Sequence, residues 1–144
     1  MAWRKPTEDD LLSSLSREEV EAYRQSGAFS HDPVEAQLMD VAEYVRGYIR
    51  SAHGVRMDPE AGTLPSSLVA PAMDYLRFKL LTRMSLEVGE SRTKAWERAQ
   101  ELFEKIAEGR FIPESSGDEP STEANLPAGA PATGRPNPEK RLLD

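Results

Sequence analysis

Apolar residues recur at helical spacing over several stretches of the chain, and the longest of these has the clearest start. Asp32-Pro33-Val34-Glu35 combines an acidic N-cap, a proline at the first helical position and an acid in the first turn, which is typical of a helix N-terminus. The pattern predicts a long central helix that ends near Gly54. Its apolar positions are Val34, Leu38, Val41, Ala42, Val45, Tyr48 and Ile49.

Two short helices are predicted before the long one. Thr7 with Asp10, and then Ser16 with Glu19, have the spacing of a capping box, in which each side chain bonds the other residue's backbone N–H. The second helix is expected to end at Gly27, because glycine suits a left-handed position after a helix. Helices this short are not stable alone, so both are expected to pack on the rest of the domain.

Two further helices follow a loop at 54–65 that is rich in proline and glycine. Pro71 is expected in the first turn of the earlier helix, since a proline deeper in a helix costs roughly 3 kcal/mol or more. Ser91 is expected to cap the later helix, and Gly109 is expected to end it. The apolar positions of these helices are Leu68, Ala72, Tyr75, Leu76, Leu80 and Met84, then Ala95, Ala99, Leu102, Phe103 and Ile106.

The chemistry of the chain changes at Pro113. Residues 113–144 carry six prolines among Ser, Gly, Ala and Glu, and such a segment cannot bury enough apolar surface to offset the entropy lost on ordering. We therefore predict an all-α compact bundle of four to five helices in residues 1–112, and an extended Pro-rich tail at 113–144 that is disordered when free. Phe111 and Ile112 are expected to fold back on the bundle as a last apolar clasp. The expected core includes Val41, Val45, Leu76, Leu80, Leu102 and Ile106.

Composition narrows the class of protein. Hydrophobic residues make up 38% of the 144 residues, and the formal net charge is −7. A nucleic-acid-binding protein normally has an excess of Lys and Arg, so the acidic balance disfavours DNA or an anionic membrane as the main partner. Cysteine is absent, which excludes disulfides and thiolate chemistry. The first ten residues lack the apolar run typical of a signal peptide, and no stretch approaches the roughly 18 apolar residues that span a bilayer, so we expect a soluble protein without a signal peptide.

No residue pattern typical of an enzyme occurs along the chain. Phosphate-binding loops, dinucleotide-binding glycine patterns and paired zinc-binding histidines are absent from the sequence. His31 precedes a predicted helix start, and His53 lies at a predicted helix end, where a cation stabilises the helix dipole. Acid pairs such as Asp9-Asp10 coincide with first helical turns. We therefore expect no catalytic site, no cofactor and no metal site.

Three features of residues 1–112 are candidates for contacts with a partner. A locally basic stretch that includes Arg77, Arg83 and Arg92 is either a solvated face, a polar subunit contact or a patch that touches DNA. Trp96 lies one step off the apolar stripe of its helix, so it either covers the edge of the core or anchors an interface. Trp3 precedes the first helix cap, and it either packs on that helix or inserts into a neighbouring subunit.

The tail holds the remaining candidates. Leu126, Leu142 and Leu143 are candidate apolar anchors, with Lys140 and Arg141 as polar supports. An extended chain of this composition can lie along a partner's surface, where many copies add avidity to weak contacts. The alternative is an ordinary frayed terminus.

The order of these elements resembles that of a known family. A short helix with Thr-x-x-Asp-Leu-Leu at 7–12 leads into a long helix that ends in Tyr48-Ile49. After a Pro-flanked loop come Ala-Met-Asp-Tyr-Leu-Arg-Phe at 72–78 and Leu-Phe-Glu-Lys-Ile-Ala-Glu-Gly at 102–109. Over residues 7–112 this pattern resembles a Mu-type phage family that is similar to the head–tail adaptor, or connector, proteins of long-tailed phages.

The resemblance implies a small, non-enzymatic, α-helical protein of the virion neck, made in the host cytoplasm. Such proteins form a homo-oligomeric ring, commonly a dodecamer, between the portal protein and a tail-side neck or terminator protein, with DNA nearby in the channel. They often use a C-terminal arm to hold the portal or a neighbouring subunit. The alternative is a small helical regulatory or DNA-binding accessory protein encoded by a phage, and the acidic balance counts against it.

Overall fold

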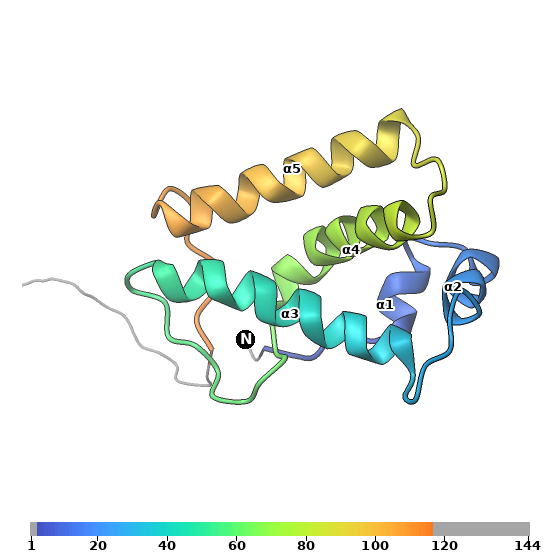
Figure 1. Ribbon diagram of the computed structural model, residues 1–144. Coiled ribbons are helices and arrows are strands. Elements are labelled where there is room, and N and C mark those ends of the chain that lie inside the picture. Colours follow the sequence, from blue (N-terminus) through green and yellow to red (C-terminus); the bar gives the residue numbers. More distant parts are fainter. Residues whose placement is uncertain (1–2, 117–144) are drawn as a thin grey trace, which may run out of the picture.

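The computed structural model describes residues 3–116 of the chain. In that range the protein has five α-helices, one short 3-10 helix and no β-strand, so the predicted all-α class is confirmed (Figure 1). Most of the predicted tail, from residue 117 on, lies outside the described residues. The helices are α1 (Glu8–Leu12), α2 (Arg17–Arg24), α3 (Pro33–Ser51), η1 (Ser66–Leu68), α4 (Val69–Arg83) and α5 (Glu90–Ala107).

The first three helices begin where the sequence predicts. Thr7 and Ser16 each cap a helix in a complete capping box, and the side chain of Asp32 accepts a hydrogen bond from the backbone N–H of Val34 at the start of α3. Pro71 lies in the first turn of α4, as predicted. These starts depend on bonds between residues close in sequence, which explains why the sequence reveals them.

Two predicted helix boundaries are wrong, the end of α2 and the start of α5. α2 ends at Arg24 rather than at Gly27, because the hydroxyl of Ser26 bonds to the carbonyl of Tyr23 at 2.7 Å and the chain leaves the helix there. Gly27 does not take the left-handed conformation. α5 begins at Glu90 after Gly89, whose φ of 93° favours glycine, so Ser91 lies inside the first turn and caps nothing.

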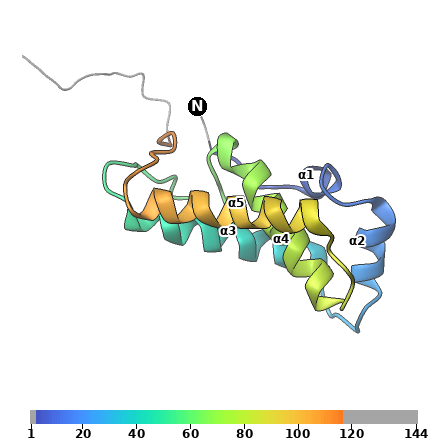
Figure 2. The same ribbon diagram turned by 90° about the horizontal axis from the view of Figure 1, so that it is seen from above.

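The core lies where α3, α4 and α5 meet. α5 lies over α3 and α4, while α1 and α2 lie beside the N-terminal end of α3 (Figures 1 and 2). Phe103 of α5 is the largest side chain that is fully buried. Leu102 is only partly buried and packs against the core. The other predicted core residues are buried: Val41, Val45, Leu76, Leu80 and Ile106.

A buried arginine fixes the loop between α3 and η1. Arg46 lies on α3, its side chain extends into the loop, and only 5% of the residue is exposed. Its guanidinium donates to the carbonyl and hydroxyl oxygens of Thr63 at 3.0 and 2.8 Å, and to the carbonyl of Asp58 at 2.8 Å. A planar fork of donors can bind several backbone oxygens at once, so Arg46 holds this loop against α3.

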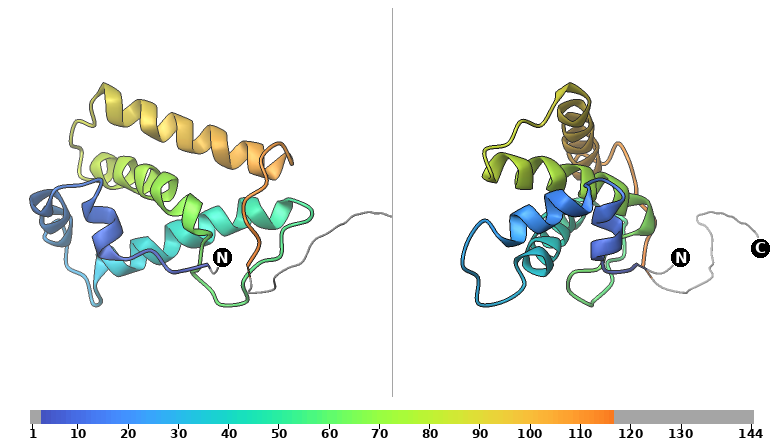
Figure 3. Two further views of the ribbon diagram at one scale, coloured as in Figure 1. Left: turned by 180° about the vertical axis from the view of Figure 1, so that it is seen from behind. Right: turned by 90° about the vertical axis from the view of Figure 1, so that its right-hand side faces the viewer.

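Residues 113–116, which we call the C-terminal strap, close the bundle. Pro113 and Ser116 are buried, and the carbonyl of Glu114 accepts the indole N–H of Trp3 at 3.1 Å. The backbone N–H of Ser116 donates to the carbonyl of Arg56 at 2.7 Å. Figure 3 shows the strap running from the end of α5 to the side of the N-terminus. The bundle therefore extends beyond the boundary predicted at residue 112, at least as far as Ser116.

The predicted apolar clasp at Phe111 and Ile112 is wrong. Phe111 is 41% exposed and Ile112 is 65% exposed. Gly109 turns the chain with a φ of 79°, and Pro113 then takes the buried position that the clasp was expected to fill.

Candidate interaction surface

Trp3 is part of the folded domain and not a free anchor. It is 5% exposed, it is hydrogen-bonded to the strap, and its ring centroid lies 5.7 Å from the guanidinium carbon of Arg46. The sequence predicted either a staple onto α1 or insertion into a neighbour. Trp3 is buried in the same core cluster as Leu11 of α1, and the strap supplies a hydrogen-bond partner that the sequence does not predict.

The basic stretch does not form a continuous patch. Arg77 donates to the carbonyl of Ser14 at 3.2 Å, and Arg92 donates to the carboxylate of Glu19 at 2.9 Å. The bond from Arg92 lowers the pKa of Glu19. Both arginines therefore join the later helices to the N-terminal part of the domain. Arg83, at the end of α4, is exposed and makes no ion pair within residues 3–116.

Trp96 lies at the edge of the core, where its ring stacks on Phe78 of α4. The ring centroids are 4.2 Å apart and the planes differ by 14°. Both side chains remain partly exposed. Trp96 therefore covers the edge of the core, as one of the two predicted alternatives states, and it still has surface free for a partner.

A tyrosine cluster continues this aromatic surface between α3 and α4. Tyr44 stacks on Tyr75, with ring centroids 4.7 Å apart, and its hydroxyl lies 3.0 Å from that of Tyr48. The bond with Tyr44 raises the pKa of Tyr48 to about 12. Phe103 is fully buried, and its ring centroid is within 6.3 Å of those of all three tyrosines. The three tyrosines are only partly buried.

Tyr75 and Phe78 are three residues apart on α4, which puts the tyrosine cluster next to the pair of Phe78 and Trp96, and we call the two groups together the aromatic face. α4 buries Ala72 and Leu76 in the core, while the large rings of Tyr75 and Phe78 stay partly exposed. Tyr, Trp and Phe are enriched in the cores of protein interfaces. The face is therefore the best candidate for a contact with a partner. It consists of Tyr44, Tyr48, Tyr75, Phe78 and Trp96.

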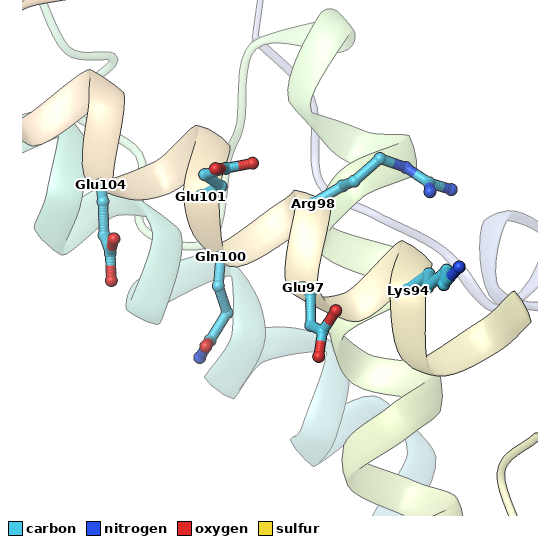
Figure 4. Close-up of a pocket in the computed structure, with 6 residues that line it drawn as sticks. All are labelled: Lys94, Glu97, Arg98, Gln100, Glu101 and Glu104. Carbon is cyan, nitrogen blue, oxygen red and sulfur yellow. The ribbon is translucent and has the colours of Figure 1, made fainter. Parts of the chain in front are cut away.

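The edge of the aromatic face is acidic along α5. Figure 4 shows the side chains of Glu97, Gln100 and Glu104 pointing to the same side of α5, away from Arg98. The pKa of Tyr48, raised first by its bond to Tyr44, is raised further by the charge of Glu104. The shallow hollow on α5 is lined by residues of this one helix, so it does not form an enclosed binding pocket between elements.

Asp40 adds a further carboxylate on the α3 side. It is exposed and lies one helical turn before Tyr44, which puts the two side chains on the same side of the helix. Lys79 on α4 is the partly exposed cation that follows Phe78. On α5, Lys94 pairs with Glu90 and Arg98 points away from Glu97 and Glu104, so these two carboxylates have no cation on their side of the helix in Figure 4.

The described residues show no other concentrated chemistry. Within residues 3–116 no group of three or more His, Asp and Glu side chains is placed to hold a metal ion. His31 and His53 are exposed. In the same part of the chain, no helix has the length and apolar character needed to cross a membrane. The tail candidates Leu126, Lys140, Arg141, Leu142 and Leu143 lie outside the described residues.

Comparison with known proteins gives no match to a family model, a curated protein or a solved structure. The family resemblance drawn from the sequence therefore remains a prediction.

Proposed function

We propose that the chain is a structural adaptor of a tailed phage, which forms a ring between the portal protein and a tail-side neck or terminator protein. The observation that carries the proposal is the aromatic face. Five aromatic side chains from three helices lie together and partly exposed on a small acidic protein. Surfaces with this composition serve in contacts between proteins. The chain acts by binding geometry, without catalysis.

The motif that carries the family resemblance also supports the proposal. Within Ala-Met-Asp-Tyr-Leu-Arg at 72–77, Ala72 and Leu76 are fully buried, Tyr75 belongs to the aromatic face, and Arg77 bonds to the carbonyl of Ser14. Each position of the motif that stands out in the sequence has a structural role in a helical subunit. None of these roles needs a ligand.

A DNA-binding accessory protein is the less favoured alternative. Such a protein needs a basic element that is free to reach phosphates. Arg77 and Arg92 are engaged within the domain, and Lys94 pairs with Glu90 at 3.5 Å. The formal net charge of −7 has the wrong sign for this role.

Co-purification with the portal protein of the same phage tests the proposal. The full chain, expressed together with the portal protein, should elute with the portal ring in many copies per ring, and native mass spectrometry should count them. A chain that leaves the portal ring bare and instead retards duplex DNA in a gel would contradict the proposal and support the alternative.

A further inference from the structure

An apolar projection lies at the C-terminal end of α5. Ile112 is the most exposed of the large apolar residues in the described part of the chain, at 65%, and Phe111 beside it is 41% exposed. The side chain of Arg110 is 67% exposed, and its guanidinium lies 3.0 Å from the carboxylate of Glu108. We call residues 110–112 the knuckle. It presents two apolar side chains to the solvent beside the exposed ion pair of Arg110 with Glu108.

The knuckle is held from both sides. On the helix side, the backbone N–H groups of Arg110 and Phe111 both donate to the carbonyl of Lys105, at 2.8 and 3.2 Å. On the other side, Pro113 is buried and Glu114 is bonded to the domain. A projection that is already fixed loses little conformational entropy when it binds. The backbone on both sides of Ile112 is therefore anchored to the domain.

The other exposed large apolar side chains either lie against a neighbour within the domain or stand alone. Phe29 packs near Tyr23, with ring centroids 6.0 Å apart. The sulfur of Met39 lies so close to Gly62 that an added Cβ there would be 2.7 Å away. Leu86 is a single side chain in the loop after α4. The knuckle is therefore the one place in residues 3–116 where two neighbouring large apolar side chains are both strongly exposed.

The knuckle and the aromatic face are complementary in chemistry. The face offers partly exposed aromatic rings with carboxylates at its edge, from Glu97, Glu104 and Asp40. The knuckle offers an aromatic ring, an aliphatic side chain and the exposed guanidinium of Arg110, which pairs with Glu108 at its Nε in the single chain. Aromatic rings attract both apolar groups and guanidinium ions, and the opposite charges favour one orientation of the contact.

We infer that the knuckle of one copy docks on the aromatic face of a second copy, with Phe111 and Ile112 against the rings and Arg110 beside the acidic edge. The occupant of the face is therefore another molecule of this chain. The inference deepens the proposed function, and it rests on that function only for the expectation that the repeated contact closes into a ring.

The contact joins two different surfaces of the same chain. In a pair of copies, one copy still has a free knuckle and the other still has a free face. Further copies can therefore add at both ends through the same contact. A head-to-tail contact of this kind forms a ring if its rotation closes and a filament if it does not. A two-fold dimer, in which the same patch meets itself, does not use the two surfaces in this way.

Cysteine cross-linking tests the inference directly, because the native chain contains no cysteine. Glu97→Cys places one thiol at the edge of the face, and Ile112→Cys places one on the knuckle. Glu18→Cys, on the exposed side of α2, is the matched control. Two single variants are mixed in equal amounts at about 1 mM protein and oxidised mildly. At this concentration a contact with a dissociation constant as weak as about 1 mM is still substantially populated. Mixing single variants also excludes a bridge within one molecule.

The mixture of Glu97→Cys and Ile112→Cys should form disulfide-linked heterodimers about tenfold faster than the mixture of Glu18→Cys and Ile112→Cys. A chain with both Glu97→Cys and Ile112→Cys should give a ladder of higher oligomers. Adding Phe111→Ser, at an exposed position that the fold tolerates, should reduce the rate to that of the control. Equal rates for the two mixtures, or bridging chiefly between two Ile112→Cys chains, would overturn the inference.

The result separates the inference from the proposed function. Equal cross-linking rates together with co-purification on the portal would remove this contact and leave the adaptor proposal in place. Fast, specific cross-linking in a chain that does not bind the portal would keep the contact between copies and remove the adaptor proposal.

Discussion

Ending the chain before or after the strap gives a sharp test of how the domain is closed. Seven hydrogen bonds join residues 113–116 to the rest of the domain. At about 1 kcal/mol each, these bonds together contribute about 7 kcal/mol. Fixing four residues costs roughly 1–2 kcal/mol each, or about 6 kcal/mol in total, so the bonds slightly exceed this cost. Burial of Pro113 and the cover over Trp3 add about 1–3 kcal/mol. A chain of residues 1–112 should therefore be less stable than a chain of residues 1–116 by about 2–3 kcal/mol.

Thermal unfolding followed by far-ultraviolet circular dichroism measures this difference. For a domain of this size, the loss corresponds to a melting temperature lower by about 10 °C. The substitution Trp3→Phe, which removes the indole N–H but keeps a ring, should cost about 1 kcal/mol in the chain 1–116 and much less in the chain 1–112. Equal melting temperatures for the two truncated chains would refute the reasoning, and the boundary would then lie at residue 112, as the sequence alone predicts.

Two further predictions concern side chains that join separate elements. Arg46→Met removes the donors that hold Thr63 and the loop after α3, so the free energy of unfolding in urea should fall by about 2–4 kcal/mol; an unchanged value would contradict this role. Arg24 bonds to Glu8 at 2.6 Å and to Asp32 at 3.2 Å, and these bonds lower the pKa of both carboxyl groups. A carboxyl group with a lowered folded pKa stabilises the fold above its unfolded pKa, and that stability is lost as the pH falls. The native chain should therefore lose stability below about pH 4.5, and Arg24→Gln should lose less over the same range; equal pH profiles for the two proteins would contradict the pairing.

The parts of the fold that depend on neighbouring residues could be predicted from the sequence. The start of α3 at Pro33, the two capping boxes and the position of Pro71 each follow from contacts within a few residues. The end of α2 was missed because the hydroxyl of Ser26, rather than Gly27, ends the helix. Serine can bond to several nearby backbone groups, and the pattern of apolar residues does not reveal which one it chooses.

The strap could not be predicted, because its contacts join distant parts of the chain. Trp3 and Glu114 are separated by 111 positions, and the composition after Pro113 is typical of disorder. Only the folded bundle brings the N-terminal segment and the end of α5 together. The same contacts explain why Phe111 and Ile112 are left exposed, although both are apolar.

The aromatic face was predicted only in part. Trp96 stands out in the sequence because it departs from the apolar stripe of its helix. Tyr48 and Tyr75 fall on predicted apolar stripes, Phe78 is noted only within the motif at 72–78, and nothing in the sequence singles out Tyr44. Their spacing, three and four residues apart, is the same for buried and exposed rings. The angles at which α3, α4 and α5 cross decide which rings reach the surface, and the sequence does not contain those angles in readable form.

Deleting the gene from a phage that encodes this chain tests the central claim most directly. Electron microscopy of the lysate should show DNA-filled heads and complete free tails that remain separate, and the full-length chain supplied from a plasmid should restore joined particles. Joined, infectious particles in the absence of the chain would contradict the proposal that it is the head–tail adaptor.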